Sequence, residues 1–310
     1  MAKFRQNHSR SNKGKSFASR GISTVVSLIA LLFIAYNQFT GSSSNDNQRN
    51  NSGNQSTYNS VPIDAKGRKY LPKDDKSEVI HHQFYSLGYN EDFEVPNWVA
   101  YKLTEESLKV KNVPRAKRFK TDNEVDNRSA KHSDYSHSGY TRGHMAPAGD
   151  MAFSTEAMQE SFFMSNMTPQ TAALNAGIWR ELEENVRDWA YDNDELYVVS
   201  GPIFDSSNPK RIGKSTKVAV PDAFFKALLD IEGSKKKAIG FIIPHEKSDL
   251  HLREYAVTVD AIEKLTGIEM FDDLMDDNEE AALEGQFDMQ KWRVDKKRFN
   301  QRNKHWNRGK

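Results

Sequence analysis

The chain has 310 residues and a formal net charge of +1; 37% of its residues are hydrophobic and 28% are charged. This length suits one moderately large domain with appendages. The absence of cysteine excludes disulfides, zinc thiolates, thiol nucleophiles and a lipidated N-terminal cysteine. The small net charge does not exclude nucleic-acid binding, because six basic residues lie in the first twenty positions and nine in the last twenty.

The first sixty residues have the order of a membrane anchor. A basic segment at 1–20 precedes an uncharged stretch whose apolar centre is Ile22–Tyr36. Because basic flanks stay in the cytoplasm, we expect a cytoplasmic segment at 1–20, a single-pass signal anchor at 21–39 and an extracytoplasmic remainder. The apolar length also allows a signal peptide, so secretion after cleavage near Thr40-Gly41-Ser42 is the alternative. Residues 40–60 are small and polar, which predicts a flexible linker.

From about Val61 the composition becomes that of a folded domain, which we place at 61–295. Runs rich in β-branched and aromatic residues predict strands at 98–103, 196–200 and 238–243. Helices are predicted at about 174–191 and 257–265, the second ending at Thr266-Gly267. Strands with few helices and no regular βαβ alternation predict an α+β domain. For the basic tail at 296–310 we favour a solvated, disordered end over a dedicated nucleic-acid arm.

A loop rich in glycine and proline, Tyr140–Asp150, carries the first chemical signal. Such a composition is typical of a structured turn. The loop places His144 close to Arg142. A neutral imidazole can accept a proton from water near pH 7, as phosphodiester hydrolysis requires. A single histidine in a loop is more often structural, so this interpretation depends on the helix that follows.

That helix carries the second signal. Asn175, Trp179, Glu183 and Arg187 are spaced by four residues and form one slanting stripe. An asparagine carbonyl can bind Mg²⁺, a glutamate can hold the water molecules of the ion, and an arginine can bind phosphate. The alternative is a solvated amphipathic helix with a Glu183–Arg187 pair. An adjacent apolar stripe that can pack on a sheet contains Ile178, Leu182, Val186 and Trp189.

Together these residues resemble the DNA/RNA non-specific endonuclease family, which includes mitochondrial endonuclease G and secreted bacterial nucleases. The family carries an Asp-Arg-Gly-His motif and then a helix of pattern N-x-x-x-W-x-x-L-E-x-x-x-R. This chain has Arg142-Gly143-His144 and then Asn175, Trp179, Leu182, Glu183 and Arg187. The resemblance covers about 65–292, and its other segments are Trp98–Tyr101, Arg115 to Asp122, Ser165–Gln170, Val199–Pro202, Val220–Lys226 and Gly240–Pro244.

The resemblance implies a role for each matching residue. His144 stands at the general base, Asn175 at the single protein ligand of the metal, and Glu183 at the acid that holds metal-bound water. Asn166 matches a second active-site asparagine, and Arg187 stands at a phosphate-facing position.

Two further arginines are candidates for substrate binding. Arg115 best matches the upstream active-site arginine of the family, although Lys117 and Arg118 are close enough to be alternatives. Arg142 lies next to the base, and a structural salt bridge is the alternative role for it.

The implied fold is a ββα-metal, or His-Me finger, nuclease motif within a mixed, mainly antiparallel sheet domain. The implied activity is metal-dependent hydrolysis of DNA and RNA without sequence preference, leaving 5′-phosphate and 3′-hydroxyl ends. Mg²⁺ is the expected cofactor, with Mn²⁺ as the alternative. Nucleic acids are the expected substrates, and the N-terminal helix is expected to contact the membrane. Thr141 replaces the first residue of the family motif; we expect activity to survive, because that aspartate is not the base and threonine can anchor the loop.

Two other functions compete with this one. A phosphodiesterase selective for small phosphoesters would need a closed pocket. A nucleic-acid-binding module of a DNA-uptake or surface machine, with vestigial chemistry, would fit the basic tail and the membrane tether but not a complete catalytic set.

Overall fold

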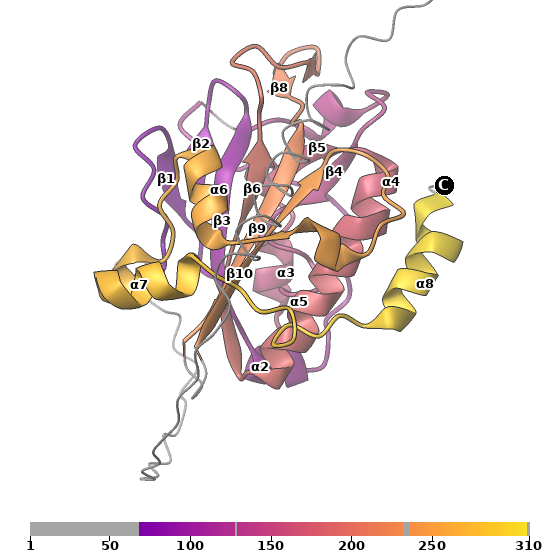
Figure 1. Ribbon diagram of the computed structural model, residues 1–310. Coiled ribbons are helices and arrows are strands. Elements are labelled where there is room, and N and C mark those ends of the chain that lie inside the picture. The colour runs from indigo at the N-terminus through magenta and orange to yellow at the C-terminus, as the bar shows by residue number, and fades with distance from the viewer. Residues whose placement is uncertain (1–67, 128, 232–235, 309–310) are drawn as a thin grey trace, which may run out of the picture. The chain divides into compact units, whose positions relative to one another are not determined.

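An antiparallel sheet of seven strands, in the order β1-β2-β3-β6-β9-β10-β11, forms the centre of the described chain (Figure 1). The computed structural model describes residues 68–127, 129–231 and 236–308. The predicted sheet segments lie in β3, β6 and β10, which confirms them. The strands span Glu78–His81 (β1), Ser86–Asn90 (β2), Val95–Thr104 (β3), Glu195–Ile203 (β6), Ala223–Asp230 (β9), Lys237–Pro244 (β10) and Ala256–Val257 (β11).

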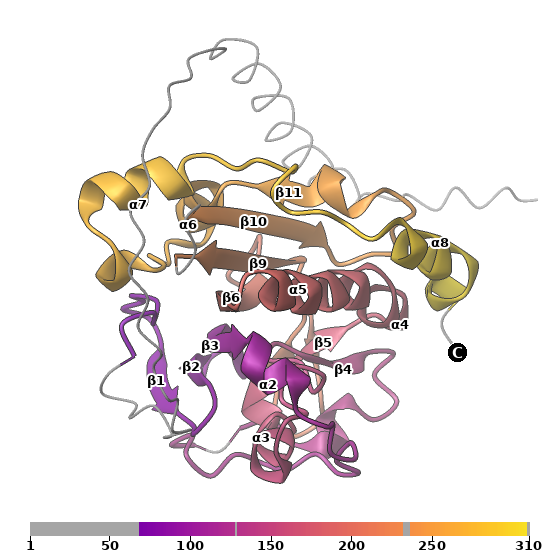
Figure 2. The ribbon, with the colours of Figure 1, turned by 90° about the horizontal axis from the view of Figure 1, so that it is seen from below.

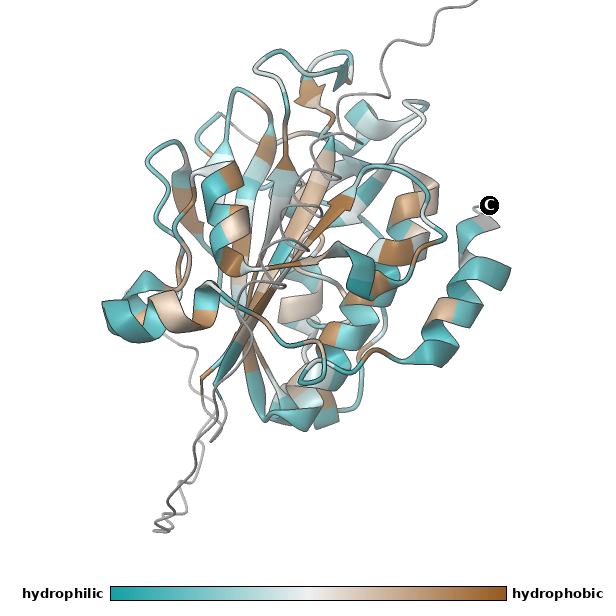
Figure 3. Cartoon of the chain, viewed as in Figure 1, coloured by the Kyte–Doolittle hydropathy of each residue, from teal (hydrophilic) through white to brown (hydrophobic). Residues whose placement is uncertain are grey.

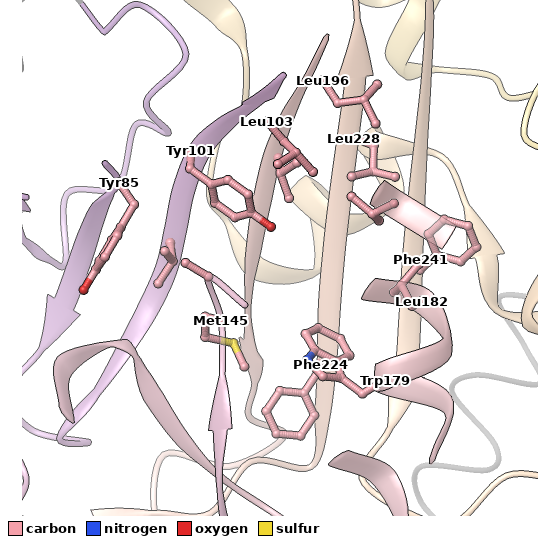
Figure 4. Packing of buried hydrophobic residues seen from close by; sticks show 14 of the residues in the cluster. Tyr85, Tyr101, Leu103, Met145, Trp179, Leu182, Leu196, Phe224, Leu228 and Phe241 are labelled. Atoms are coloured by element: carbon pink, nitrogen blue, oxygen red, sulfur yellow. The ribbon is translucent and has the colours of Figure 1, made fainter. Parts of the chain in front are cut away.

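Each face of this sheet packs against a different helix. Alternate residues of a strand point to opposite faces. Val198 joins the cluster that contains Leu182 of α5 (Arg180–Asp192). Figure 4 shows Leu182 with other members of this cluster. Val199 points the other way and joins the cluster that contains Ile262 of α6 (Val259–Thr266). The hydrophobic residues are concentrated in these strands and on the inner sides of the helices (Figure 3). The prediction of an α+β domain with a mainly antiparallel sheet is confirmed.

A second, two-stranded sheet is the part of the fold that carries the histidine. β4 (Thr141–His144) pairs antiparallel with β5 (Met167–Gln170), and the chain continues into α4 (Ala172–Leu174), a π-helical turn at Asn175–Trp179, and α5. The remaining elements are α2 (Glu105–Lys109), α3 (Thr155–Glu160), β7 (Arg211–Ile212), β8 (Val218–Ala219), α7 (Asp277–Glu284), α8 (Lys296–Lys304) and short 3₁₀ turns at His132–Tyr135, Met164–Asn166, Leu252–Tyr255, Asp272–Leu274 and Trp306–Arg308.

Both predicted helices are present. The first runs from Ala172 to Asp192, but a π-helical turn with non-helical dihedral angles at Gly177 interrupts it. The second is α6, and Gly267 ends it in the left-handed conformation at φ 71°. Glycine adopts this conformation without a steric penalty, which is why it stops the helix there.

The expectation of a disordered basic tail is wrong for the described part of 296–310. Lys296–Lys304 forms α8 (Figure 2). The side chain of Arg302 in this helix is fully buried against Glu181 of α5. Arg302 also donates hydrogen bonds to the carbonyls of Ser248 and Leu250. These buried contacts hold the tail against the domain. The partners lie far away in the sequence, so the local charge pattern of the tail does not reveal them.

The predicted anchor at 21–39 and linker at 40–60 lie outside the described residues. Within the three described ranges, no helix combines the length and the apolar character that crossing a bilayer requires.

Candidate active site

The end of β4 and the start of the long helix bring His144 and Asn175 into one unit. His144 is the last residue of β4 and pairs with Met167 of β5. Its backbone carbonyl accepts a hydrogen bond of 3.3 Å from Nε1 of Trp179, whose ring is fully buried. Trp179 therefore fastens the helix that carries Asn175 to the strand that carries His144.

The side chain of Asn175 is held in one orientation by Thr141. Its Nδ2 donates to Oγ1 of Thr141 at 2.8 Å, and the same hydroxyl donates to the carbonyl of Gln170 at 2.9 Å. Because that hydroxyl proton is already used, Thr141 can only accept from Asn175, which assigns the nitrogen of the amide to this side. Oδ1 of Asn175 accepts no hydrogen bond from any described residue. A carbonyl oxygen kept available in this way is a ligand that fits Mg²⁺ or Mn²⁺.

His144 lies in an apolar pocket and is held in its neutral form. The residue is 7% exposed, and its ring centroid lies 5.0 Å from that of Phe162 and 5.8 Å from that of Phe119. Nε2 of His144 is buried and makes no hydrogen bond with the described residues. Burial, and secondly the positive charge of Arg115, lower the pKa of His144 to about 3. The imidazole is therefore unprotonated at neutral pH, which is the state from which a general base acts.

Both upstream arginine candidates lie near this histidine, but they are held differently. The Arg115 guanidinium is over the ring of Phe162 at 5.0 Å, and the residue is exposed. Arg142 donates to the carbonyl of His132 at 2.6 Å, and its guanidinium lies 5.4 Å from the ring centroids of both Phe119 and Tyr135. Hydrogen bonding and aromatic contacts hold Arg142, and no salt bridge to it is present among the described residues. Arg115 remains the arginine that solvent, and hence a phosphate, can reach.

The helix also presents Glu183 and Arg187 to a group of buried charges. Arg187 pairs with Asp150 at 2.8 Å, and the hydroxyl of Tyr101 donates to the other oxygen of that carboxylate at 2.7 Å. The Glu183–Arg187 pair that the helical spacing suggested is absent from the described ion pairs, and Asp150 takes its place. Glu183 has no hydrogen bond or ion pair with a described residue, which leaves its carboxylate available to a ligand.

Lys226 is a charged residue near Glu183. The sequence analysis assigned no role to Lys226. It lies in β9, is fully buried, and its Nζ is 5.0 Å from the ring centroid of Trp179 and makes no hydrogen bond with a described residue. Burial lowers the pKa of Lys226 and raises that of Glu183, while the attraction between the two opposes both shifts. A single charge inside the otherwise apolar run Ala223–Leu229 was the signal that could have identified it.

Asn166 has a positioning role in this structure. The residue is fully buried; its Oδ1 accepts from the backbone N–H of Ala146 at 2.8 Å. Its Nδ2 donates to the carbonyls of Ala146 and Ser161 at 3.0 and 2.8 Å. These bonds fix the loop that follows His144, so Asn166 helps to hold the candidate base in position.

Comparison with known proteins gives consistent matches over the same region. The model of the DNA/RNA non-specific endonuclease family matches residues 66–277. The mitochondrial nuclease EXOG of Xenopus laevis is 38% identical over 216 residues, which are 64% of this chain and 59% of that protein, so this chain spans less than two thirds of it. Nuclease C1 of Cunninghamella echinulata var. echinulata is 36% identical over 213 residues, which are 64% of this chain and 84% of that protein.

A bacterial relative and a solved structure extend these matches. A nuclease of Nostoc sp. is 33% identical over 239 residues, which are 73% of this chain and 84% of that protein. A chain in the crystal structure of the EndoG/EndoGI complex superposes with a TM-score of 0.63 at 31% identity, covering 70% of this chain and 94% of that one.

Proposed function

Since this chain belongs to the DNA/RNA non-specific endonuclease family, we propose that it is a metal-dependent endonuclease that hydrolyses the phosphodiester bonds of DNA and RNA without sequence preference. The observation that carries this proposal is the pair formed by a neutral His144, whose Nε2 has no hydrogen-bond partner among the described residues, and an Asn175 whose Oδ1 is left available. The β4–β5 pair and the helix after it correspond to the ββα-metal motif that this family implies. We assign the base to His144 and the metal ligand to Asn175.

The residues of this site divide the chemistry between them. His144 accepts a proton from the attacking water molecule, and Phe119 and Phe162 shield it from bulk solvent. Glu183 would accept hydrogen bonds from water on an ion held at Asn175, and Arg115 binds the phosphate. Arg187, whose direction Asp150 fixes, adds positive charge beside Glu183. Bound at Asn175, Mg²⁺ or Mn²⁺ would neutralise negative charge on the phosphate and the leaving oxygen.

The lack of sequence preference follows from the kind of groups in this site. Arginine and a metal recognise the phosphate backbone, which is the same at every step of a nucleic acid. We assign products with 5′-phosphate and 3′-hydroxyl ends. Arg142, held by His132 and two aromatic rings, contributes to the positive field of this surface.

The test is digestion of covalently closed plasmid DNA, a single-stranded RNA and bis(p-nitrophenyl) phosphate by the full-length chain in Mg²⁺. We expect plasmid and RNA to be cut, and the DNA products to accept label from polynucleotide kinase only after phosphatase treatment. Cleavage of the small diester alone would favour the small-phosphoester enzyme. Tight DNA binding without cleavage in Mg²⁺ or Mn²⁺ would favour the binding module.

We further propose that residues 21–39 anchor the protein to a membrane with the catalytic domain outside the cytoplasm. The uncharged stretch and the preceding basic segment support this topology. We expect the full-length protein to resist alkaline carbonate extraction and to be degraded by protease added to spheroplasts. Release into the medium with a shortened N-terminus would instead support cleavage and secretion.

A further inference from the structure

Three carboxylates meet between α6 and α7, away from the candidate active site. Asp260 and Glu263 lie on α6, and Glu284 is the last residue of α7. One carboxylate oxygen from each residue lies within 4.8 Å of the other two. α6 packs on the sheet face opposite to α5, so this cluster and Asn175 lie on different sides of the sheet (Figures 1 and 2).

Glu284 is the residue that distinguishes this cluster from an ordinary acidic surface. It is 2% exposed, and its Oε1 is buried without a hydrogen-bond partner among the described residues. No described ion pair includes Asp260, Glu263 or Glu284, so within the described ranges no lysine or arginine neutralises them. A buried carboxylate without a partner is strongly unfavourable. Burial and the neighbouring carboxylates raise the pKa of Glu284 to about 9, and a cation bound beside these carboxylates would oppose this shift.

The local fold also favours positive charge at this place. Glu284 lies at the C-terminal end of α7, where the partial charges of the last carbonyls attract cations. Glu263 is oriented by a hydrogen bond of 2.7 Å from the backbone N–H of Met270 to its Oε1. Asp260 is exposed, so an ion has access from solvent.

We propose that Asp260, Glu263 and Glu284 bind a calcium ion that fastens α7 to α6. Three oxygens equally spaced around one calcium ion, at the preferred metal–oxygen distances of about 2.3–2.6 Å, lie at most about 4.5 Å apart. The three carboxylate oxygens lie within 4.8 Å of one another, so a shift of a few tenths of an ångström at most brings all three to one ion. Three carboxylates supply the hard oxygen donors that this ion takes, and water can complete its coordination. α7 is mostly hydrophilic (Figure 3), and Leu283 is its one residue packed against the core cluster of this face. Bound calcium would therefore supply the attachment that the weakly apolar helix lacks.

The test uses the full-length chain carrying Asn175→Ala, so that the candidate active site does not contribute a signal. Equilibrium dialysis with ⁴⁵Ca²⁺ should show one bound calcium per chain, and the melting temperature should be higher in Ca²⁺ than in EDTA. Adding Glu284→Gln should weaken calcium binding at least about tenfold, as loss of a charged ligand does. Above about pH 9, where Glu284 is ionised, the same substitution should raise the melting temperature in EDTA, because it removes an unpaired buried carboxylate.

Two further variants make the result specific. Glu279→Gln changes the same charge on the same helix, but Glu279 pairs with Lys236 outside the cluster, so calcium binding should persist. Asp260→Asn removes an exposed ligand with little risk to folding, and it should also weaken binding. Absence of bound calcium at millimolar Ca²⁺, equal binding by the Glu284→Gln protein, or binding of Mg²⁺ but not Ca²⁺ would each overturn the proposal.

Discussion

Thr141, the residue that departs from the family motif, holds the candidate metal ligand in place. It links the side chain of Asn175 to the backbone of Gln170 through one hydroxyl group. Thr141→Ala removes this link, and we expect the Mg²⁺ concentration for half-maximal cleavage to rise about 10- to 100-fold, the usual effect of losing a group that orients a metal ligand. Thr141→Ser keeps the hydroxyl and should retain most of the affinity. An unchanged Mg²⁺ titration of the alanine variant would contradict this role.

Glu183 should control the acid side of the pH profile. Burial raises the pKa of Glu183 above the ordinary value, so Glu183 becomes protonated as the pH falls through that raised value. His144, in contrast, stays neutral down to about pH 3. Activity should therefore fall with Glu183 first. We expect Glu183→Gln to lower kcat/KM about 10- to 100-fold and to move the remaining acid limb to lower pH. If the limb stays at the wild-type pH in this variant, another group controls it.

At the scale of single residues, the family motif supplied His144, Asn175 and Glu183 as candidates for groups that face a ligand, but it did not supply the groups that support them. In the structure Trp179 donates a hydrogen bond to the carbonyl of His144 and lies beside Lys226, whose charge acts on Glu183. Lys226 and Asp150, which pairs with Arg187, received no role in the sequence analysis, because their contacts join residues that are far apart in the sequence. The three hydrogen bonds of Asn166 likewise join residues that no local pattern connects.

At the scale of elements, periodicity predicted the long helix but not the π-helical turn within it. Gly177 in this turn lies close to the C-terminal segment, because a Cβ atom there would be 2.6 Å from Oδ1 of Asn307. Asn307 is itself held by a hydrogen bond of 2.8 Å from its Nδ2 to the carbonyl of Ser248. This close approach joins residues far apart in the sequence, so the helical periodicity does not reveal it.

The buried pair Arg302–Glu181 should make α8 important for stability. Both side chains are fully buried, with 2.5 Å between Nε of Arg302 and Oε2 of Glu181. Arg302→Met leaves Glu181 unpaired in the interior, and we expect the free energy of unfolding to fall by about 3–5 kcal/mol in urea titrations. The double variant with Glu181→Leu should recover much of this loss. Arg253→Ala, which breaks an exposed pair with Glu254, should cost about 0–1 kcal/mol. A loss of that small size for Arg302→Met would show that α8 is not anchored by this pair.

At the scale of the whole molecule, the α+β class and three of the seven strands of the large sheet followed from the sequence, because those three strands have strong local signals. β3, β6 and β10 are apolar runs bounded by polar or Gly/Pro positions. The strand order and the separation of α5 and α6 onto opposite faces depend on long-range pairing, which the sequence pattern does not encode. The family resemblance supplied the expectation of a nuclease domain, and the match over 66–277 confirms the family.

The most direct test of the central claim is plasmid cleavage by the full-length protein, its His144→Ala variant and a His305→Ala control, each in Mg²⁺ and in EDTA. His305 is exposed after α8, so its loss should leave cleavage unchanged. The proposed mechanism predicts Mg²⁺-dependent cleavage that EDTA abolishes and that His144→Ala slows at least about 100-fold, with an unchanged circular dichroism spectrum. Wild-type cleavage rates for His144→Ala, or no cleavage by the folded wild-type chain in Mg²⁺ or Mn²⁺, would contradict it.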